Sequence, residues 1–254
     1  MSLVEFAVED EIAIVTINRP EARNAVDQPT AAALADAFRR FDTADALSVA
    51  ILTGAGGTFC AGADLKAVAT SRGNRVTEDG DGPLGCTRML LGKPVIAAVE
   101  GFAVAGGLEL ALWCDLRVAE LDATFGVYCR RFGVPLCDGG TIRLPRLIGM
   151  SRAMDMILTG RGVSGKEAFA MGLVNRVTEP GSVMTQAREL AKQIAGFPQR
   201  CLRGDRMSAY EAWTMPLDAA LKNEYRHGIA TLQSGETRAG AEKFASGVER
   251  HGKF

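Results

Sequence analysis

The stretch PVIAAVEGFAVAGGLELALWCDL, residues 94–116, decides how this chain folds. It starts with a short apolar run rich in β-branched residues and ends in a longer apolar run that contains none of them. Glycines separate the two runs, with Gly106 and Gly107 adjacent. This order predicts a buried strand, a tight turn and a buried helix. The adjacent glycines also let the backbone come close to a ligand, at the positive end of that helix.

A second stretch, ILTGAGGTFCAGADLKAVA at residues 51–69, has the same order of strand, glycine turn and helix. It is not a nucleotide-binding loop, because no Gly-Lys-Ser/Thr follows and GAGGTF does not complete a dinucleotide fingerprint. For either turn alone, a plain connection between strand and helix is the simpler interpretation. Two such turns in one domain could instead direct two backbone N–H groups at the same ligand oxygen, which is an oxyanion hole.

Further patterns place these turns in a larger α/β core. Alternating or short apolar runs predict strands at residues 4–8, 12–18, 48–54, 94–101, 115–120 and 173–177, the first two as a hairpin. Apolar residues at helical spacing predict a helix capped by Asp27 or Thr30. From about Ser151 most of the chain has helical periods, without a linker. We expect an α/β core over residues 1–195 and a helical region over residues 196–254, joined in one folding unit.

The composition excludes several functional classes. The 254 residues carry a formal net charge of −1, so no nucleic acid or anionic membrane is expected as a partner. No apolar run approaches the roughly 20 residues that a transmembrane helix needs. The first residues, MSLVEFAVEDE, are acidic and lack the basic and apolar regions of a signal peptide. We therefore expect a cytoplasmic protein.

Cysteine and histidine usage argues against metal and imidazole chemistry. The 6 cysteines form no Cys-x-x-Cys pair and have no neighbouring histidine, which fits neither a zinc site nor a disulfide framework. The 2 histidines, His227 and His251, lie near the C-terminus, far from both glycine turns in sequence. A mechanism that needs an imidazole beside a serine, a cysteine or a metal is therefore disfavoured. We expect no metal and no redox cofactor.

The two glycine turns carry a resemblance to a known family. AGADL (61–65), paired with PVIAAVEGFAVAGGLEL (94–110), resembles the crotonase superfamily, the enoyl-CoA hydratase/isomerase family. The likeness extends from INRPEARNAV (17–26) through DGGTIRLPRLIGMSRAMDMILTG (138–160) to EAFAMGLVNRV (167–177). It implies an α/β fold, a crotonase-like spiral of repeated ββα units with a helical C-terminal trimerisation region. It also implies an acyl-CoA substrate, in which CoA enters as part of the substrate, and a homotrimer or dimer of trimers.

The resemblance also implies an oxyanion hole and a CoA site. The oxyanion donors would be the backbone N–H groups of Ala63 and Gly106. The CoA moiety would be held by residues near the first turn and, at a subunit boundary, by a residue of the C-terminal helices. These residues are Arg23, Asn24, Ala25, Ala61, Asp64, Lys66 and Phe244. For Arg23 and Lys66, an ordinary solvated charge is the alternative interpretation.

Two carboxylates are the candidate catalytic acids. Glu109 stands among apolar residues near the start of the predicted helix, where partial burial would raise its pKa toward neutrality. The second glutamate of the family's hydratases falls at Cys129, whose thiol orients a water molecule less well than a carboxylate. Asp138 is the nearest substitute, although its place before GGTIRL also suits a helix N-cap. The polar, glycine-rich residues 70–85 are expected to form a mobile loop over this site.

These observations favour an enoyl-CoA hydratase-like lyase that stabilises an enolate in the oxyanion hole. An enoyl-CoA double-bond isomerase that uses Glu109, Asp138 or both is one alternative. Another is a family member that binds acyl-CoA or RNA without catalysis, although the mild net charge disfavours RNA. A carboxylate retained in an apolar setting is costly, which disfavours a catalytically silent protein.

Overall fold

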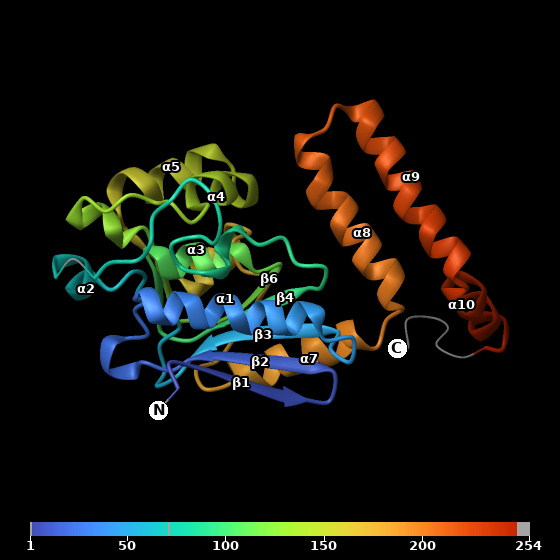
Figure 1. The fold of residues 1–254 in the computed structure, drawn as a ribbon, viewed down its shortest axis with the longest axis horizontal. Helices are drawn as coiled ribbons and strands as arrows, with labels where there is room; N and C mark the ends of the chain where they lie inside the picture. Colours follow the sequence, from blue (N-terminus) through green and yellow to red (C-terminus); the bar gives the residue numbers. More distant parts are fainter. Residues whose placement is uncertain (1, 71, 248–254) are drawn as a thin grey trace. The chain divides into compact units, whose positions relative to one another are not determined.

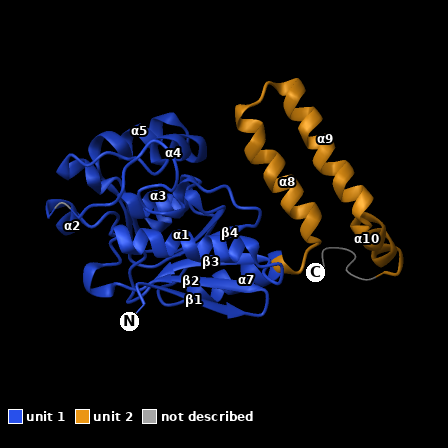
Figure 2. Cartoon of the chain, in the orientation of Figure 1, with its two compact units in different colours: residues 1–194 blue, residues 195–254 orange. Residues whose placement is uncertain are grey.

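The computed structural model describes residues 2–70 and 72–247. The chain divides into two units, residues 1–194 and residues 195–254, which have different colours in Figure 2. The first unit contains both glycine turns and both candidate acids. Every predicted site residue except Phe244 lies in it as well.

A mixed sheet forms the centre of the first unit (Figure 1). Among the described residues it has the strand order β1-β2-β3-β4-β6-β9. The bounds are β1 Val4–Glu9, β2 Ile12–Ile17, β3 Val49–Gly54, β4 Val95–Val99, β6 Leu116–Glu120 and β9 Arg176–Thr178. β1 and β2 form the predicted antiparallel hairpin, and the later pairs are parallel. β3 and β4 are buried throughout, which explains why their sequences are apolar without alternation.

The last strand differs from its prediction at residues 173–177. β9 is shorter and starts only at Arg176, after a connection that wraps the end of helix α6 (Gly165–Ala170). In this connection the N–H groups of Leu173 and Val174 donate to Ala168 O, at 2.8 and 3.2 Å. Both side chains are buried in the core. Their apolar character therefore comes from packing in a helix-to-strand connection and not from a strand.

Three short strands that the sequence patterns do not predict form a second sheet. In the described part of the chain its order is β5-β7-β8, with bounds Phe102–Val104, Thr124–Gly126 and Gly162–Ser164. β5 follows β4 and leads into helix α3 (Gly106–Trp113), so the stretch 94–116 begins as strand, strand and helix. Runs of three residues are too short to show an alternating pattern, which is why composition alone misses them.

Helices cover the sheet of the first unit (Figure 1). Up to residue 195 they are η1 Pro20–Ala22, α1 Gln28–Thr43, α2 Leu65–Ala69, η2 Cys86–Arg88, α3, η3 Tyr128–Phe132, α4 Gly140–Ile148, α5 Met150–Thr159, α6 and α7 Val183–Ala195. Of the two cap candidates for α1, Asp27 is the cap, because its carboxylate accepts from Thr30 N at 3.0 Å. The apolar face of α1, which includes Leu34, Phe38 and Phe41, is fully buried.

Helix α3 is buried on every side, as expected for a helix whose residues are apolar all round. The Phe38 ring of α1 packs edge-on against Trp113 at the end of α3, with 4.7 Å between ring centroids. A buried side chain of β6, Arg117, satisfies carbonyl groups at the C-terminus of α3. Its guanidinium donates to Ala111 O at 3.1 Å and Cys114 O at 2.7 Å. It also donates to Leu173 O at 2.7 Å.

The second unit consists of helices α8 (Gln199–Glu211), η4 (Ala212–Thr214), α9 (Leu217–Ser234) and α10 (Glu236–Ala245). Phe244 lies on α10 and is 63% exposed. Its proposed contact with CoA, and the trimer that the C-terminal helices would form, stay predictions. Among the described residues, no helix combines the length and the apolar composition needed to cross a bilayer.

Replacement of Arg117 by Met tests whether this side chain holds α3 in place. The variant keeps the packing volume of the side chain but leaves buried carbonyl oxygens without their donor. We expect the free energy of unfolding to fall by about 3 kcal/mol. Urea unfolding at one fixed protein concentration measures it. The same substitution at the exposed Arg152 is the control and should change stability by less than about 0.5 kcal/mol; equal losses at both sites would contradict the assignment.

Candidate active site

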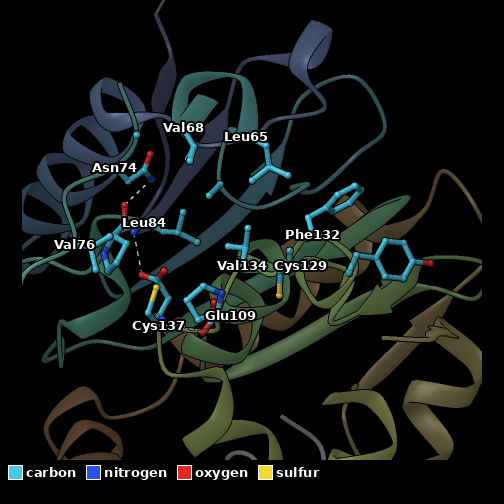
Figure 3. A pocket seen from close by; sticks show the side chains of 18 of the residues that line it. Leu65, Val68, Asn74, Val76, Leu84, Glu109, Cys129, Phe132, Val134 and Cys137 are labelled. Carbon is cyan, nitrogen blue, oxygen red and sulfur yellow. Dashed lines mark hydrogen bonds between the residues drawn. The ribbon is translucent and has the colours of Figure 1, made fainter. Parts of the chain in front are cut away.

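A pocket of about 430 Å³ lies where the two glycine turns meet (Figure 3). Its walls come from both turns, from helix α3, from the segment between residues 73 and 84, and from the residues between β7 and α4. Most lining side chains are apolar, but the lining also includes the carboxyl groups of Glu109 and Asp138. The pocket thus brings together six predicted site residues: Ala61, Ala63, Gly106, Glu109, Cys129 and Asp138.

The two glycine turns are in direct contact. A β-carbon on Gly62 would lie 2.8 Å from Gly106 N, so this close approach requires glycine. The N–H groups of Ala63 and Gly106 donate to no acceptor among the residues that the structure describes. Both residues line the pocket, so both donors are available to a ligand oxygen.

Ala105, the residue before Gly106, has an uncommon backbone conformation. Its φ is 54°, a value that residues with a β-carbon rarely adopt. Its N–H donates to Gly126 O at 2.8 Å, and its carbonyl oxygen accepts from Leu108 N at 3.1 Å. The neighbouring sheet and the first turn of α3 therefore hold this peptide from both sides. Backbone strain of this kind clusters at functional sites.

Glu109 lies in the first turn of α3 and is only 2% exposed. Its Oε1 accepts from Asp138 N at 2.9 Å and from Gly140 N at 2.8 Å. No described residue donates to Oε2. Burial raises the pKa of this carboxyl group to about 7, although the two N–H donors oppose the rise. A carboxyl group with this pKa can both accept and release a proton near neutral pH.

Asp138 is not the cap of helix α4, so that interpretation is wrong. The N-cap is Gly139, and the Asp138 carboxyl group points instead toward the segment 84–87. There its Oδ1 accepts from Leu84 N at 3.0 Å and from the Thr87 hydroxyl group. The side chain is 4% exposed, and burial raises its pKa while both hydrogen bonds oppose the rise. Its place on the pocket makes it a candidate acid without a capping role.

Cys129 lies in η3 and lines the same pocket, with 5% of its surface exposed. Burial and the nearby Glu109 carboxylate both raise the pKa of its thiol. Cys137, which no sequence pattern marks as a site residue, also lines the pocket, and burial raises its pKa to about 11. Both thiols are therefore protonated at neutral pH and are poor nucleophiles.

Within the predicted loop 70–85, five residues line the pocket: Gly73, Asn74, Val76, Pro83 and Leu84. Figure 3 labels Asn74, Val76 and Leu84 among them. Asn74 Nδ2 donates to Pro83 O at 2.7 Å, which ties the two ends of the segment together. Sequence reasoning missed the apolar lining residues Leu65, Val68, Phe132 and Val134. Helical spacing of Leu65 and Val68 is the one local signal of that lining.

The residues predicted to hold CoA separate into two groups. Arg23 and Lys66 are exposed. Asn24, in contrast, is fully buried, and its amide donates to Ala55 O at 2.8 Å and to Thr58 O at 2.5 Å. The Asn24 side chain therefore holds the first glycine turn.

Asp64 also has a structural role in this turn. It caps α2 by accepting from Lys66 N at 3.0 Å, and it forms an ion pair with Arg19 at 3.0 Å. Arg19 in turn donates to the carbonyl oxygen of the buried Ala25. Arg19 also pairs with Asp27, at 3.2 Å. Nothing local to INRPEA shows that Arg19 joins these two acids, so its role is not apparent from the sequence. Whether any of these residues contacts CoA stays a prediction.

The raised pKa of Glu109 predicts a pH-dependent cost to stability. The pKa is about 7 in the fold against an ordinary value of 4.5, so the folded state binds more protons between these values. Wild-type stability should therefore fall relative to Glu109→Gln as pH rises from 4.5 to about 7, and then level off. Across this range the stability of wild type relative to Gln should fall by about 3 kcal/mol. Urea unfolding of both proteins between pH 4 and 8 measures it; a difference independent of pH would refute the assignment.

Comparisons with known proteins agree with this geometry. A sequence model of the family "Enoyl-CoA hydratase/isomerase" matches residues 7–251. The enoyl-CoA hydratase EchA19 of Mycobacterium tuberculosis is 38% identical, over 91% of this chain and 89% of that protein. The (E)-benzylidenesuccinyl-CoA hydratase of Thauera aromatica is 39% identical, over 85% of each chain.

Solved structures extend the agreement to the fold. The crystal structure of enoyl-CoA hydratase EchA1 from Mycobacterium marinum is 40% identical, covers 97% of this chain and 96% of its own, and superposes with a TM-score of 0.91. This likeness confirms the predicted α/β, crotonase-like fold class. The chain therefore belongs to the enoyl-CoA hydratase/isomerase family.

Proposed function

We propose that this protein is a lyase that adds water to the double bond of a 2-enoyl-CoA. The observation that carries the proposal is the pair of buried carboxyl groups, Glu109 and Asp138, on one pocket with the N–H groups of Ala63 and Gly106. One oxygen of each carboxyl group is held by two protein donors, which leaves the other oxygen for the reaction. Family membership supports the substrate class, because the relatives named above are hydratases of CoA esters.

The two N–H groups would bind the thioester carbonyl oxygen. As water adds to the β-carbon, negative charge develops on that oxygen, and the donors of Ala63 and Gly106 stabilise it. Loss of one such donor typically costs about 10² to 10³ in rate. The contact between the two turns fixes both donors before substrate binds, so little reorganisation is needed during the reaction.

The two carboxyl groups would act as general base and general acid. The ionised member of the pair takes a proton from the attacking water, whose oxygen forms the new bond to the β-carbon. The protonated member delivers a proton to the α-carbon as the enolate collapses to a thioester. Product release and one proton exchange with solvent restore the pair. The pair works near neutral pH because the pKa of Glu109 is raised to about 7 and that of Asp138 is raised as well.

Double-bond isomerisation is the second candidate, and Cys129 favours it. At position 129 the family resemblance places a second glutamate, but this chain has a buried, protonated thiol. A water molecule there would lack the carboxylate that orients it in a hydratase. Isomerisation of a 3-enoyl-CoA needs no water. One carboxylate removes the α-proton, the N–H groups bind the dienolate oxygen, and the same or the other acid returns a proton to the γ-carbon.

Incubation of crotonyl-CoA in D2O with three proteins distinguishes these functions. Wild type should add water, seen as a mass increase and as a hydroxylated β-carbon in the proton NMR spectrum. Glu109→Gln and Asp138→Asn should each lower the rate by about 10² to 10⁴, since each removes one acid–base group. Asp36→Asn, on an exposed face of α1, is the control and should behave as wild type.

Each other outcome selects a different function. If wild type adds no water but converts a 3-enoyl-CoA to the 2-enoyl isomer, the enzyme is an isomerase. If it does neither and no deuterium enters the acyl chain, saturable binding of acyl-CoA without turnover becomes the function. If Asp138→Asn alone keeps full activity, Glu109 acts without it.

The lining of the pocket also restricts the acyl group. The described lining residues include no lysine, arginine or histidine, and four of them form an apolar wall: Leu65, Val68, Phe132 and Val134. An acyl chain that ends in a carboxylate would meet two acidic side chains and no cation in this lining. The proposed substrate is therefore a 2-enoyl-CoA whose acyl group is uncharged and apolar.

Two six-carbon substrates test this restriction. 2-Hexenoyl-CoA and its analogue with a terminal carboxylate have the same chain length and the same CoA moiety. We expect kcat/KM to be about 100-fold lower for the charged analogue, because an unpaired carboxylate is costly in an apolar pocket. Steady-state hydration rates measure the ratio. Equal values would show that the chain end lies in solvent and not against the apolar wall.

A further inference from the structure

The segment 82–88 holds the Asp138 carboxyl group through two different residues. Leu84 donates its backbone N–H to Oδ1 at 3.0 Å, and Thr87 donates its hydroxyl group to the same oxygen. The Leu84 side chain lines the pocket and lies against Gly106, where a β-carbon would be 2.5 Å from Leu84 Cδ1. One short segment therefore touches both the second acid and the second oxyanion donor.

The Thr87 hydroxyl group is buried and closely packed. Thr87 is 1% exposed and does not line the pocket. A β-carbon on Gly82 would lie 2.0 Å from Thr87 Oγ1 and 3.0 Å from Asp138 Oδ1, so a backbone without a side chain packs against this pair. Gly82 is fixed in turn by two hydrogen bonds with Gly85, at 3.0 and 2.8 Å.

Arg143 joins the backbones that carry the two partners. Its Nη1 donates to Asp138 O at 2.8 Å, and its Nη2 donates to Thr87 O at 2.8 Å. A planar guanidinium with two parallel donors fixes the distance between its acceptors better than a flexible ammonium would. The Thr87 hydroxyl group and the Asp138 carboxyl group are thus held opposite each other from both their side chains and their main chains.

We infer that Thr87 is the positioning residue of Asp138: its hydroxyl group, set by Gly82 and Arg143, fixes Oδ1 and leaves Oδ2 to the acyl pocket. This inference rests on the proposed function, in which Asp138 is one of the two acids. A hydrogen bond to a carboxylate favours its ionised form, so Thr87 also lowers the pKa of Asp138. The other charged or titratable groups around Asp138 are Glu109 of α3, Arg88 and Cys86 of η2, Arg143 of α4, Cys137 and Cys60.

The experiment compares Thr87→Val, which removes the hydroxyl group at nearly constant volume, with Thr87→Ser, which keeps it. Thr87→Val should lower kcat by about 10- to 100-fold, with KM within about 2-fold because Thr87 does not line the pocket. Thr87→Ser should stay within about 3-fold of wild type. In an Asp138→Asn background, Thr87→Val should have almost no further effect, since the group that it positions is already altered.

A second readout does not depend on turnover. Carbon-13 NMR of labelled aspartate follows the titration of the Asp138 carboxyl group, which should move to higher pH in Thr87→Val and stay at its wild-type position in Thr87→Ser.

If both variants leave the titration unchanged while Asp138→Asn abolishes turnover, the inference is wrong and the proposed function stands. The inference is also wrong if Thr87→Val and Thr87→Ser change kcat and KM by the same factors. It is likewise wrong if Thr87→Val lowers kcat in the Asp138→Asn background by the same factor as in wild type. If the titration moves as expected but Asp138→Asn turns over as wild type, the role of Asp138 in the proposed function fails instead.

Discussion

The site depends on one buried carboxyl group, that of Glu109. Removal of a carboxylate from water is costly, and the fold offsets this cost with the N–H groups of Asp138 and Gly140. These two bonds join the first turn of α3 to the start of α4, which are distant in sequence but adjacent in the fold. The bond from Asp138 N also fixes the backbone of Asp138, the candidate for the second acid. A Glu109 carboxyl group exposed to solvent would need neither contact.

The glycines around this carboxyl group serve close approach more than flexibility. A β-carbon on Gly107 would lie 2.0 Å from Cys60 O, and one on Gly140 would lie 2.9 Å from Glu109 Oε1. The first distance shows how closely one glycine turn packs on the other. The second shows how closely the start of α4 packs on the Glu109 carboxyl group. Each turn alone is an ordinary strand-to-helix connection; only in contact do they present two N–H groups to one pocket.

The sequence predicts the site where the chemistry is local and fails where it comes from tertiary contacts. Strand, glycine turn and apolar helix in residues 94–116 single out Gly106 and Glu109, because all three signals lie within one stretch. Both residues line the pocket, and their catalytic roles stay predictions. The cap prediction for Asp138 is wrong because the competing partners, Leu84 and Thr87, are more than 50 residues away in the chain. Thr87 has no local feature that separates it from any other threonine. The three short strands of the second sheet are not predicted for a related reason. Their pairing with one another defines them, and their composition does not.

A thiol at position 129 changes the electrostatics of the pocket as well as its acid count. A carboxylate beside Glu109 would add a like charge and raise the pKa of Glu109 above the value near 7 that suits proton exchange. The protonated Cys129 adds no charge, so the pKa of Glu109 is set mainly by its burial, which raises it, and by the Gly140 N–H group, which opposes the rise. Asp138 is in turn held by the segment 82–88, through Leu84 and Thr87. Under the proposed function, Asp138 would serve as the second acid in place of a residue at position 129, so the pocket would still hold two carboxyl groups.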